Sequence, residues 1–110
     1  MLTEADAIRT ESFGFITVML IGQLPTPCDV LEELGHYPGT GMGAARIYLR
    51  EVRKPGLENT YCIQGLGKIW SINRMIPDKI SKIVEIYLNN HLVRTIRVIE
   101  VSGRGWFNIH

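Results

Sequence analysis

Short apolar segments rich in β-branched and aromatic residues recur along the chain, with turn-forming residues between them. Residues 13–24 alternate in part between apolar and polar side chains and are punctuated by Gly14 and Gly22, which favours a strand over a helix. Pro25 and Pro27 then fix their own backbone angles and end this segment. The same criteria predict further strands at residues 45–52, 61–64, 68–72, 83–88 and 91–101.

Three segments fit more than one pattern. Residues 45–52 satisfy a helical face as well as a strand, and the neighbouring turn signals favour the strand. Residues 80–88 fit a helical stripe behind a Pro-Asp start signal, so both a helix and a strand stay open there. The pattern of residues 30–34 is also ambiguous. Because Asn89 and Asn90 can adopt the positive φ angles of a type I′ turn, we predict a terminal hairpin around them.

The pattern as a whole predicts an all-β fold. About seven short strands at regular spacing are typical of an antiparallel β-sandwich. The 110 residues suffice for one domain, which would bury roughly two thirds of the surface of the unfolded chain. We place this domain at residues 13–110. Residues 1–12 are polar and weakly periodic, which indicates an N-terminal tail or a short docking helix.

The chain contains two cysteines, Cys28 after the proline pair and Cys62 within the predicted strand at residues 61–64. We interpret the two as a disulfide. A bridge between them would stabilise the fold by about 3.8 kcal/mol on the chain-entropy relation. It would also place the protein in an oxidising compartment.

Charge and hydropathy argue against several classes of partner. Twelve Lys and Arg stand against eleven Asp and Glu, so no overall field steers the protein toward nucleic acid or an anionic membrane. The longest apolar run, residues 15–21, is too short to span a bilayer, which needs about twenty residues. We therefore expect no nucleic acid and no membrane span. If the protein is exported, a signal peptide has been removed from its N-terminus.

Three elements carry a resemblance to a known family. Leu-Pro-Thr-Pro-Cys at residues 24–28 follows a strand, Tyr-Cys-Ile-Gln stands at residues 61–64, and an asparagine-turn hairpin spans residues 88–93. In this combination, over roughly residues 16–101, the chain resembles small bacterial immunoglobulin-like β-sandwich domains that are secreted or attached to lipoproteins. The resemblance implies an immunoglobulin-like fold and an extracytoplasmic location, either secreted or tethered to a membrane. It implies no established enzymatic activity.

Motifs for catalysis are weak. Residues 39–44 fit a dinucleotide-binding fingerprint, but no long buried strand precedes them and the domain lacks room for repeated βαβ units. Cys28, His36, Cys62 and His91 are residue types that bind zinc, yet their spacing does not pre-organise a tetrahedral site. A cysteine nucleophile would need one of these histidines as its base. We therefore expect neither a metal nor a cofactor, and no enzyme.

The remaining candidates for function are surface contacts. A glycine-rich loop at residues 38–43 is predicted to be a hairpin tip or an excursion between strands. Near the C-terminus an arginine precedes a Trp-Phe pair, a combination typical of binding hot spots, although a structural role in a last strand is favoured for this segment. The candidate contacts are Gly39, Gly41, Gly43, Arg104, Trp106 and Phe107.

The sequence thus predicts a non-catalytic, extracytoplasmic binding module for an unidentified protein or cell-surface partner. One alternative is an exported protease inhibitor, in which the proline-rich loop at residues 24–28, braced by the disulfide, enters an active-site cleft. A cysteine-dependent hydrolase is a second alternative, and it requires Cys28 or Cys62 as a free thiol.

Overall fold

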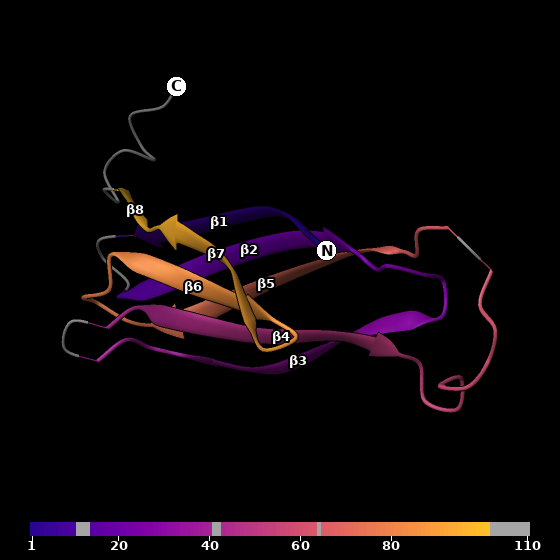
Figure 1. Cartoon of the computed structure of the whole chain (residues 1–110). Coiled ribbons are helices and arrows are strands. Elements are labelled where there is room, and N and C mark those ends of the chain that lie inside the picture. Colours follow the sequence, from indigo (N-terminus) through magenta and orange to yellow (C-terminus); the bar gives the residue numbers. More distant parts are fainter. Residues whose placement is uncertain (11–13, 41–42, 64, 102–110) are drawn as a thin grey trace, which may run out of the picture.

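The computed structural model describes residues 1–10, 14–40, 43–63 and 65–101, which form two four-stranded sheets without a helix (Figure 1). The strands are β1 (Leu2–Thr10), β2 (Phe15–Gln23), β3 (Asp29–Tyr37), β4 (Ala45–Arg53), β5 (Ile69–Pro77), β6 (Ile83–Leu88), β7 (His91–Arg97) and β8 (Ile99–Val101). The predicted all-β sandwich is confirmed, with eight strands in place of about seven. Residues 30–34, which the sequence left unassigned, lie within β3.

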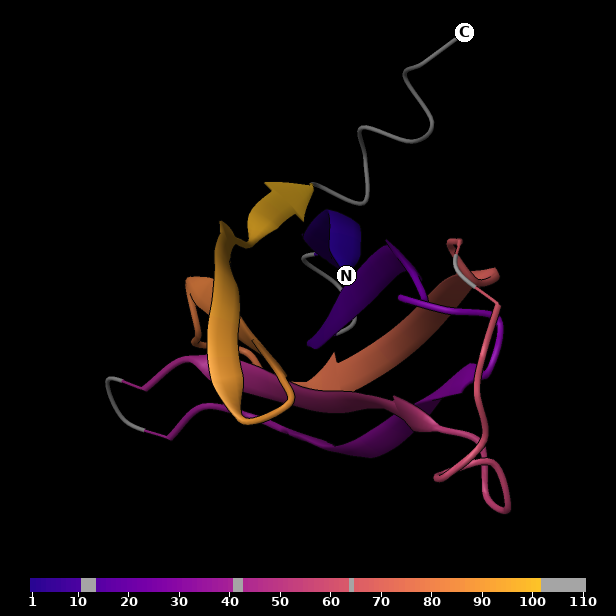
Figure 2. The same cartoon turned by 45° about the vertical axis from the view of Figure 1, so that its right-hand side comes forward.

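The two sheets pack as layers (Figure 2). Sheet 1 has the strand order β5-β2-β1-β8, and sheet 2 has the order β3-β4-β6-β7. Four of the six strand pairings are antiparallel, whereas β1 with β8 and β4 with β6 run parallel. Between β4 and β6 the chain passes through β5 in the other sheet, and this crossover lets the second strand enter in the direction of the first.

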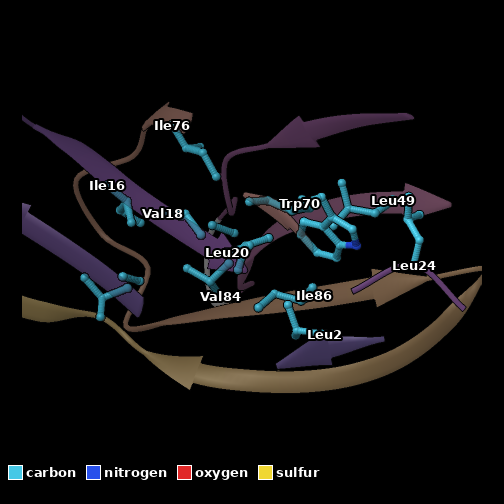
Figure 3. Packing of buried hydrophobic residues seen from close by; sticks show 14 residues of the cluster. Leu2, Ile16, Val18, Leu20, Leu24, Leu49, Trp70, Ile76, Val84 and Ile86 are labelled. Carbon is cyan, nitrogen blue, oxygen red and sulfur yellow. The ribbon is translucent and has the colours of Figure 1, made fainter. Parts of the chain in front are cut away.

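The core lies between the sheets and follows from strict alternation along the strands (Figure 3). In β2 every second side chain is inaccessible to solvent, namely Ile16, Val18 and Leu20. Strand β4 contributes Ile47 and Leu49 from the opposite layer by the same alternation. Burial of such aliphatic side chains stabilises the fold by about 1.5–3 kcal/mol each.

Trp70 on β5 is buried in this core (Figure 3). Its Nε1–H donates to Glu51 Oε2 at 2.9 Å, so the polar edge of the indole is satisfied inside the protein. The indole covers Gly22 on the neighbouring strand, and a Cβ at position 22 would collide with it. Gly22 is therefore a packing requirement within β2.

The N-terminal segment differs from the expected tail or docking helix, because Leu2–Thr10 is strand β1. This strand lies between β2 and β8 and contributes Leu2 and Ala7 to the core. A central strand with one solvated face needs apolar residues only at alternate positions. Because the outer face of β1 is polar, the local sequence did not indicate a strand, which forms through pairing with its neighbours in the sheet.

The strand predicted at residues 61–64 is absent from its described part, residues 61–63. Tyr61 and Ile63 are 85% and 77% exposed, and they belong to the connection between β4 and β5. The prediction from β-propensity is wrong here, because that propensity reflects side-chain packing on a sheet and this segment has no sheet beneath it. The disulfide itself is confirmed, since Cys62 is bonded to Cys28 with the Cα atoms 6.1 Å apart.

The ambiguity at residues 80–88 is settled in favour of a strand, because Ile83–Leu88 is β6. It pairs with β4 on one side and with β7 on the other, and its buried Val84 and Ile86 continue the core. Asn89 and Asn90 have φ angles of 51° and 67° in the turn that follows. The predicted asparagine hairpin is thereby confirmed.

Candidate binding groove

Three tyrosines from neighbouring strands stand in a row on the outer face of sheet 2. The rings of Tyr48 and Tyr87 are stacked, with centroids 4.8 Å apart and planes inclined by 17°. Tyr37 meets Tyr48 edge to face, with centroids 5.8 Å apart and planes inclined by 68°. Because each such pair stabilises its arrangement by about 0.5–1.5 kcal/mol, the row is organised before any ligand binds.

The strand register explains this row. Tyr48 stands between two buried residues of β4 and therefore points away from the core. Parallel pairing of β4 with β6 places Tyr87 directly beside it. On the other side, Tyr48 pairs with Gly35 at a bulge of β3, where φ is 147°. A Cβ at Gly35 would press against the ring of Tyr37, so glycine leaves the space that this ring needs.

Charged side chains flank the tyrosines and are already paired. Arg46 Nε donates to Glu85 Oε1 at 3.1 Å, and the Tyr87 hydroxyl donates to the same oxygen at 3.3 Å. Desolvation and the negative charge of Glu85 raise the pKa of Tyr87, so its hydroxyl stays protonated at neutral pH. A second pair, Arg50 Nη2 with Glu32 Oε2 at 2.7 Å, stands further along the same face.

Beside the tyrosines, where β3 and β4 approach their connection, the surface contains an open cavity of about 560 Å³. This volume lies in the range of small-ligand pockets, roughly 300–1,000 Å³. The cavity combines aromatic and aliphatic walls with one guanidinium group. Its lining includes Leu34, Tyr37, Pro38, Gly43, Arg46 and Tyr48. We call this cavity, together with the ring of Tyr87, the tyrosine groove.

A buried carboxylate anchors the chain at one wall of the groove. Asp78 Oδ2 accepts hydrogen bonds from Gly39 N at 2.7 Å and from Ser81 Oγ at 2.6 Å, while Oδ1 accepts from Ser81 N and Ile80 N. Burial by itself would raise the pKa of Asp78, but these hydrogen bonds outweigh it and lower the pKa to about 2. A Cβ at Gly39 would collide with Ser81 Oγ, so this anchor requires glycine.

Arg9 extends the anchor into sheet 1. Its side chain is buried, with Nη2 3.5 Å from Asp78 Oδ1. Nη2 also donates to Ser81 O at 2.7 Å, and Nη1 donates to Glu100 Oε1 at 2.6 Å. The network therefore links β1 and β8 to the wall of the groove. Because the carboxylate oxygens of Asp78 already accept these hydrogen bonds, Asp78 positions the loop at Gly39 and has no free acceptor to offer a substrate.

The structure brings together some of the residues predicted from the sequence. Gly39 and Gly43 both border the groove, within the connection from β3 to β4 that the sequence predicts as a hairpin tip. The remaining predicted contacts lie outside the described residues. They are Gly41, Arg104, Trp106 and Phe107.

Sequence reasoning missed the three tyrosines. A signal was present, since each occupies the outward register of its strand beside charged residues of the same face, as Tyr48 does between Arg46 and Arg50. Only the pairing of β3, β4 and β6 reveals that the three rings meet.

The chemistry of the cysteines is altered by their bond. Cys28 and Cys62 form a disulfide, and the described residues contain no free cysteine, so neither sulfur is available as a thiolate nucleophile in this form. Across the described ranges, no three His, Cys, Asp or Glu side chains gather as a metal site. The same residues include no helix that is long and apolar enough to cross a membrane.

The proline-rich segment at residues 24–28 forms a compact turn between β2 and β3. Thr26 O accepts from Asp29 N at 3.2 Å, and Leu24 O accepts from Gly67 N at 2.9 Å. An inhibitory loop has to offer extended backbone to a protease, whereas these carbonyl groups already have partners inside the protein. Protease inhibition stays a prediction that this turn does not favour.

The fold and the groove define a class: a disulfide-linked, two-layer β-sandwich with a row of tyrosines on one outer face. The chain matches no protein-family model, no curated protein and no solved structure. The groove itself is therefore the feature of the molecule that bears on function.

Proposed function

We propose that this protein is a non-catalytic, immunoglobulin-like binding module that acts outside the cytoplasm and uses the tyrosine groove to bind a protein or cell-surface partner. The observation that carries the proposal is the organised row of Tyr37, Tyr48 and Tyr87 beside an open cavity. Nothing in the proposal requires bond making or breaking.

The composition of the groove supports a protein as the partner. Tyrosine and arginine are enriched among the residues that dominate protein–protein affinity, because they combine large contact area with polar tips. Tyr48 and Arg46 stand together at this groove, and the stacked rings lose little side-chain entropy when a partner covers them. The groove also offers hydroxyl and guanidinium donors for orientation.

The disulfide supports an extracytoplasmic location. Disulfides form and persist in secreted and periplasmic proteins and are reduced in most cytosols. The Cys28–Cys62 bond ties down the long connection between β4 and β5, at the end of the sandwich away from the β3–β4 connection (Figure 1). The bond thus serves the stability of a small exported domain and leaves the groove open.

The test is saturable binding of the fluorescently labelled full chain to the surface of intact cells of its source. Tyr48→Ala removes the ring shared by both aromatic pairs, and we expect it to weaken binding by at least about tenfold. Tyr61→Ala, in the exposed connection between β4 and β5, is the matched control and should bind like the wild type. Thermal unfolding of both variants checks that they are folded.

Equal binding by Tyr48→Ala and the wild type would exclude the tyrosine groove as the contact surface. Absence of saturable binding by the wild-type protein would contradict a cell-surface partner.

A further inference from the structure

The outer face of sheet 1 carries an apolar patch that the groove does not use. Strand register places Ile99, Ile8, Thr17 and Met75 side by side in one row across all four strands. Other apolar side chains on the same face adjoin this row. The patch consists of Ile8, Phe15, Met19, Met75, Pro77 and Ile99.

These side chains are accessible to solvent, with exposed fractions from 38% for Phe15 to 58% for Ile99 among those quantified. The charged strand residues on this face are Glu4 and Asp6, both acidic and both toward one end. Its outward strand positions contain neither lysine nor arginine. A contiguous apolar surface with a polar rim marks an interaction site in soluble proteins.

We propose that this patch is the interface through which two copies of this chain form a symmetric dimer, sheet 1 against sheet 1. Area supports a second copy. Large side chains about half exposed present roughly 500 Å² of apolar surface here, and a homodimer interface is about 65% apolar. The whole interface would then cover about 800 Å² per partner, the size at which specific pairs become stable.

Charge selects the orientation of the two copies. If the strands of the copies ran parallel, Asp6 would meet its own counterpart, and like charges in contact are unfavourable. A twofold axis along the row of Ile8, Thr17 and Met75 reverses the strands and moves the acidic ends apart. Each residue of the row then faces its own copy across the axis. Both tyrosine grooves stay on the outside, so the dimer is bivalent.

Sedimentation equilibrium on the full chain tests the dimer. The wild type should self-associate with a dissociation constant on the order of micromolar. Met75→Glu places two carboxylates face to face and should raise this constant at least about 100-fold. The matched control is Leu92→Glu on β7, an apolar residue 50% exposed beside the 56% of Met75, on the outer face of sheet 2. This control should dimerise like the wild type.

A mixing experiment tests the axis. Met75→Glu and Met75→Lys should each be monomeric alone, and their equimolar mixture should form a heterodimer, because the axis brings the opposite charges together. Failure of the mixture to dimerise, with each variant folded by circular dichroism, would overturn the proposed geometry.

Two further outcomes would overturn the dimer itself. One is a wild-type protein that stays monomeric at its solubility limit, which would leave the segment at residues 102–110 or a different protein as the occupant of the patch. The other is a dimer that Leu92→Glu disrupts and Met75→Glu does not. The first result leaves the tyrosine groove unaffected, because the groove lies on the opposite layer. The second would place the dimer contact on the face of the groove, since Leu92 pairs with Tyr87.

Discussion

The two outer faces of the sandwich obey the same alternation and carry opposite chemistry. On sheet 2, Tyr48 and Tyr87 stand among paired charges such as Arg46 with Glu85. On sheet 1, Met19 and Met75 belong to an apolar patch, and no ion pair joins the outward strand residues that the structure describes. The outward positions of sheet 1 and sheet 2 therefore form two distinct surfaces, each with its own recognition chemistry.

The inner faces show why this division is possible. Inward residues such as Ile16 and Ile86 have to interdigitate at close packing, so their size and shape are constrained. Outward residues need only be compatible with the strand conformation and with exposure to water. The outer faces of a sandwich can consequently differ in charge and aromatic content without disturbing the fold.

The largest expected effect comes from removing the disulfide, which stabilises the fold that carries both outer faces. Replacing both Cys28 and Cys62 by serine should lower the free energy of unfolding by about 3.8 kcal/mol, because the unfolded chain regains the entropy of the closed loop. Denaturant unfolding measures this change. Reduced wild-type protein should match the variant, and a loss below about 1 kcal/mol would mean that the bond does not constrain the unfolded chain.

A smaller effect is expected at Asp78, which ties the wall of the tyrosine groove to sheet 1. Its folded-state pKa of about 2 lies below the ordinary value of 3.8, so the carboxylate form is favoured by folding. The resulting stabilisation, about 2 kcal/mol, is complete above about pH 5 and disappears as the pH falls through 4 to about 2.

Urea unfolding at a series of pH values tests this contribution. Asp78→Asn should flatten the acid limb of the stability profile and lower stability at neutral pH, because Ser81 and Gly39 lose a charged acceptor. An unchanged acid limb in the variant would assign the pH dependence to other carboxylates.

The smallest effect is expected at the ion pair of the tyrosine face. Arg46 is about half exposed, so Arg46→Gln should lower the midpoint of thermal unfolding by no more than about 4 °C. Thermal unfolding at low and high salt measures this change. A decrease of more than about 8 °C would show that Arg46 stabilises the fold as well as the surface.

Local pattern was sufficient for much of the fold. β2 and the turn at Asn89 and Asn90 follow from propensity and turn chemistry, and both form as predicted. The failures have one cause. β1 is polar in composition yet is flanked by two strands, whereas residues 61–63 are apolar yet have no sheet beneath them. Strand formation depends on partners, which local sequence does not contain.

The candidate site divides in the same way. Gly39 and Gly43 were identifiable from the sequence, because glycine clusters mark loops. The sequence did not indicate that Tyr37, Tyr48 and Tyr87, from three different strands, would form one row. Their contact depends on a parallel pairing and on a bulge, and neither leaves a periodic signal in the chain.

By itself, the sequence determined that this chain is a β protein with a cysteine pair and an asparagine hairpin, because alternation, cysteine count and turn residues act over a few neighbours. Tertiary structure alone decided that β1 is a central strand, that Asp78 and Arg9 join the layers, and that one outer face is aromatic and the other apolar. These features arise from strand order and register, which depend on contacts between residues far apart in the chain.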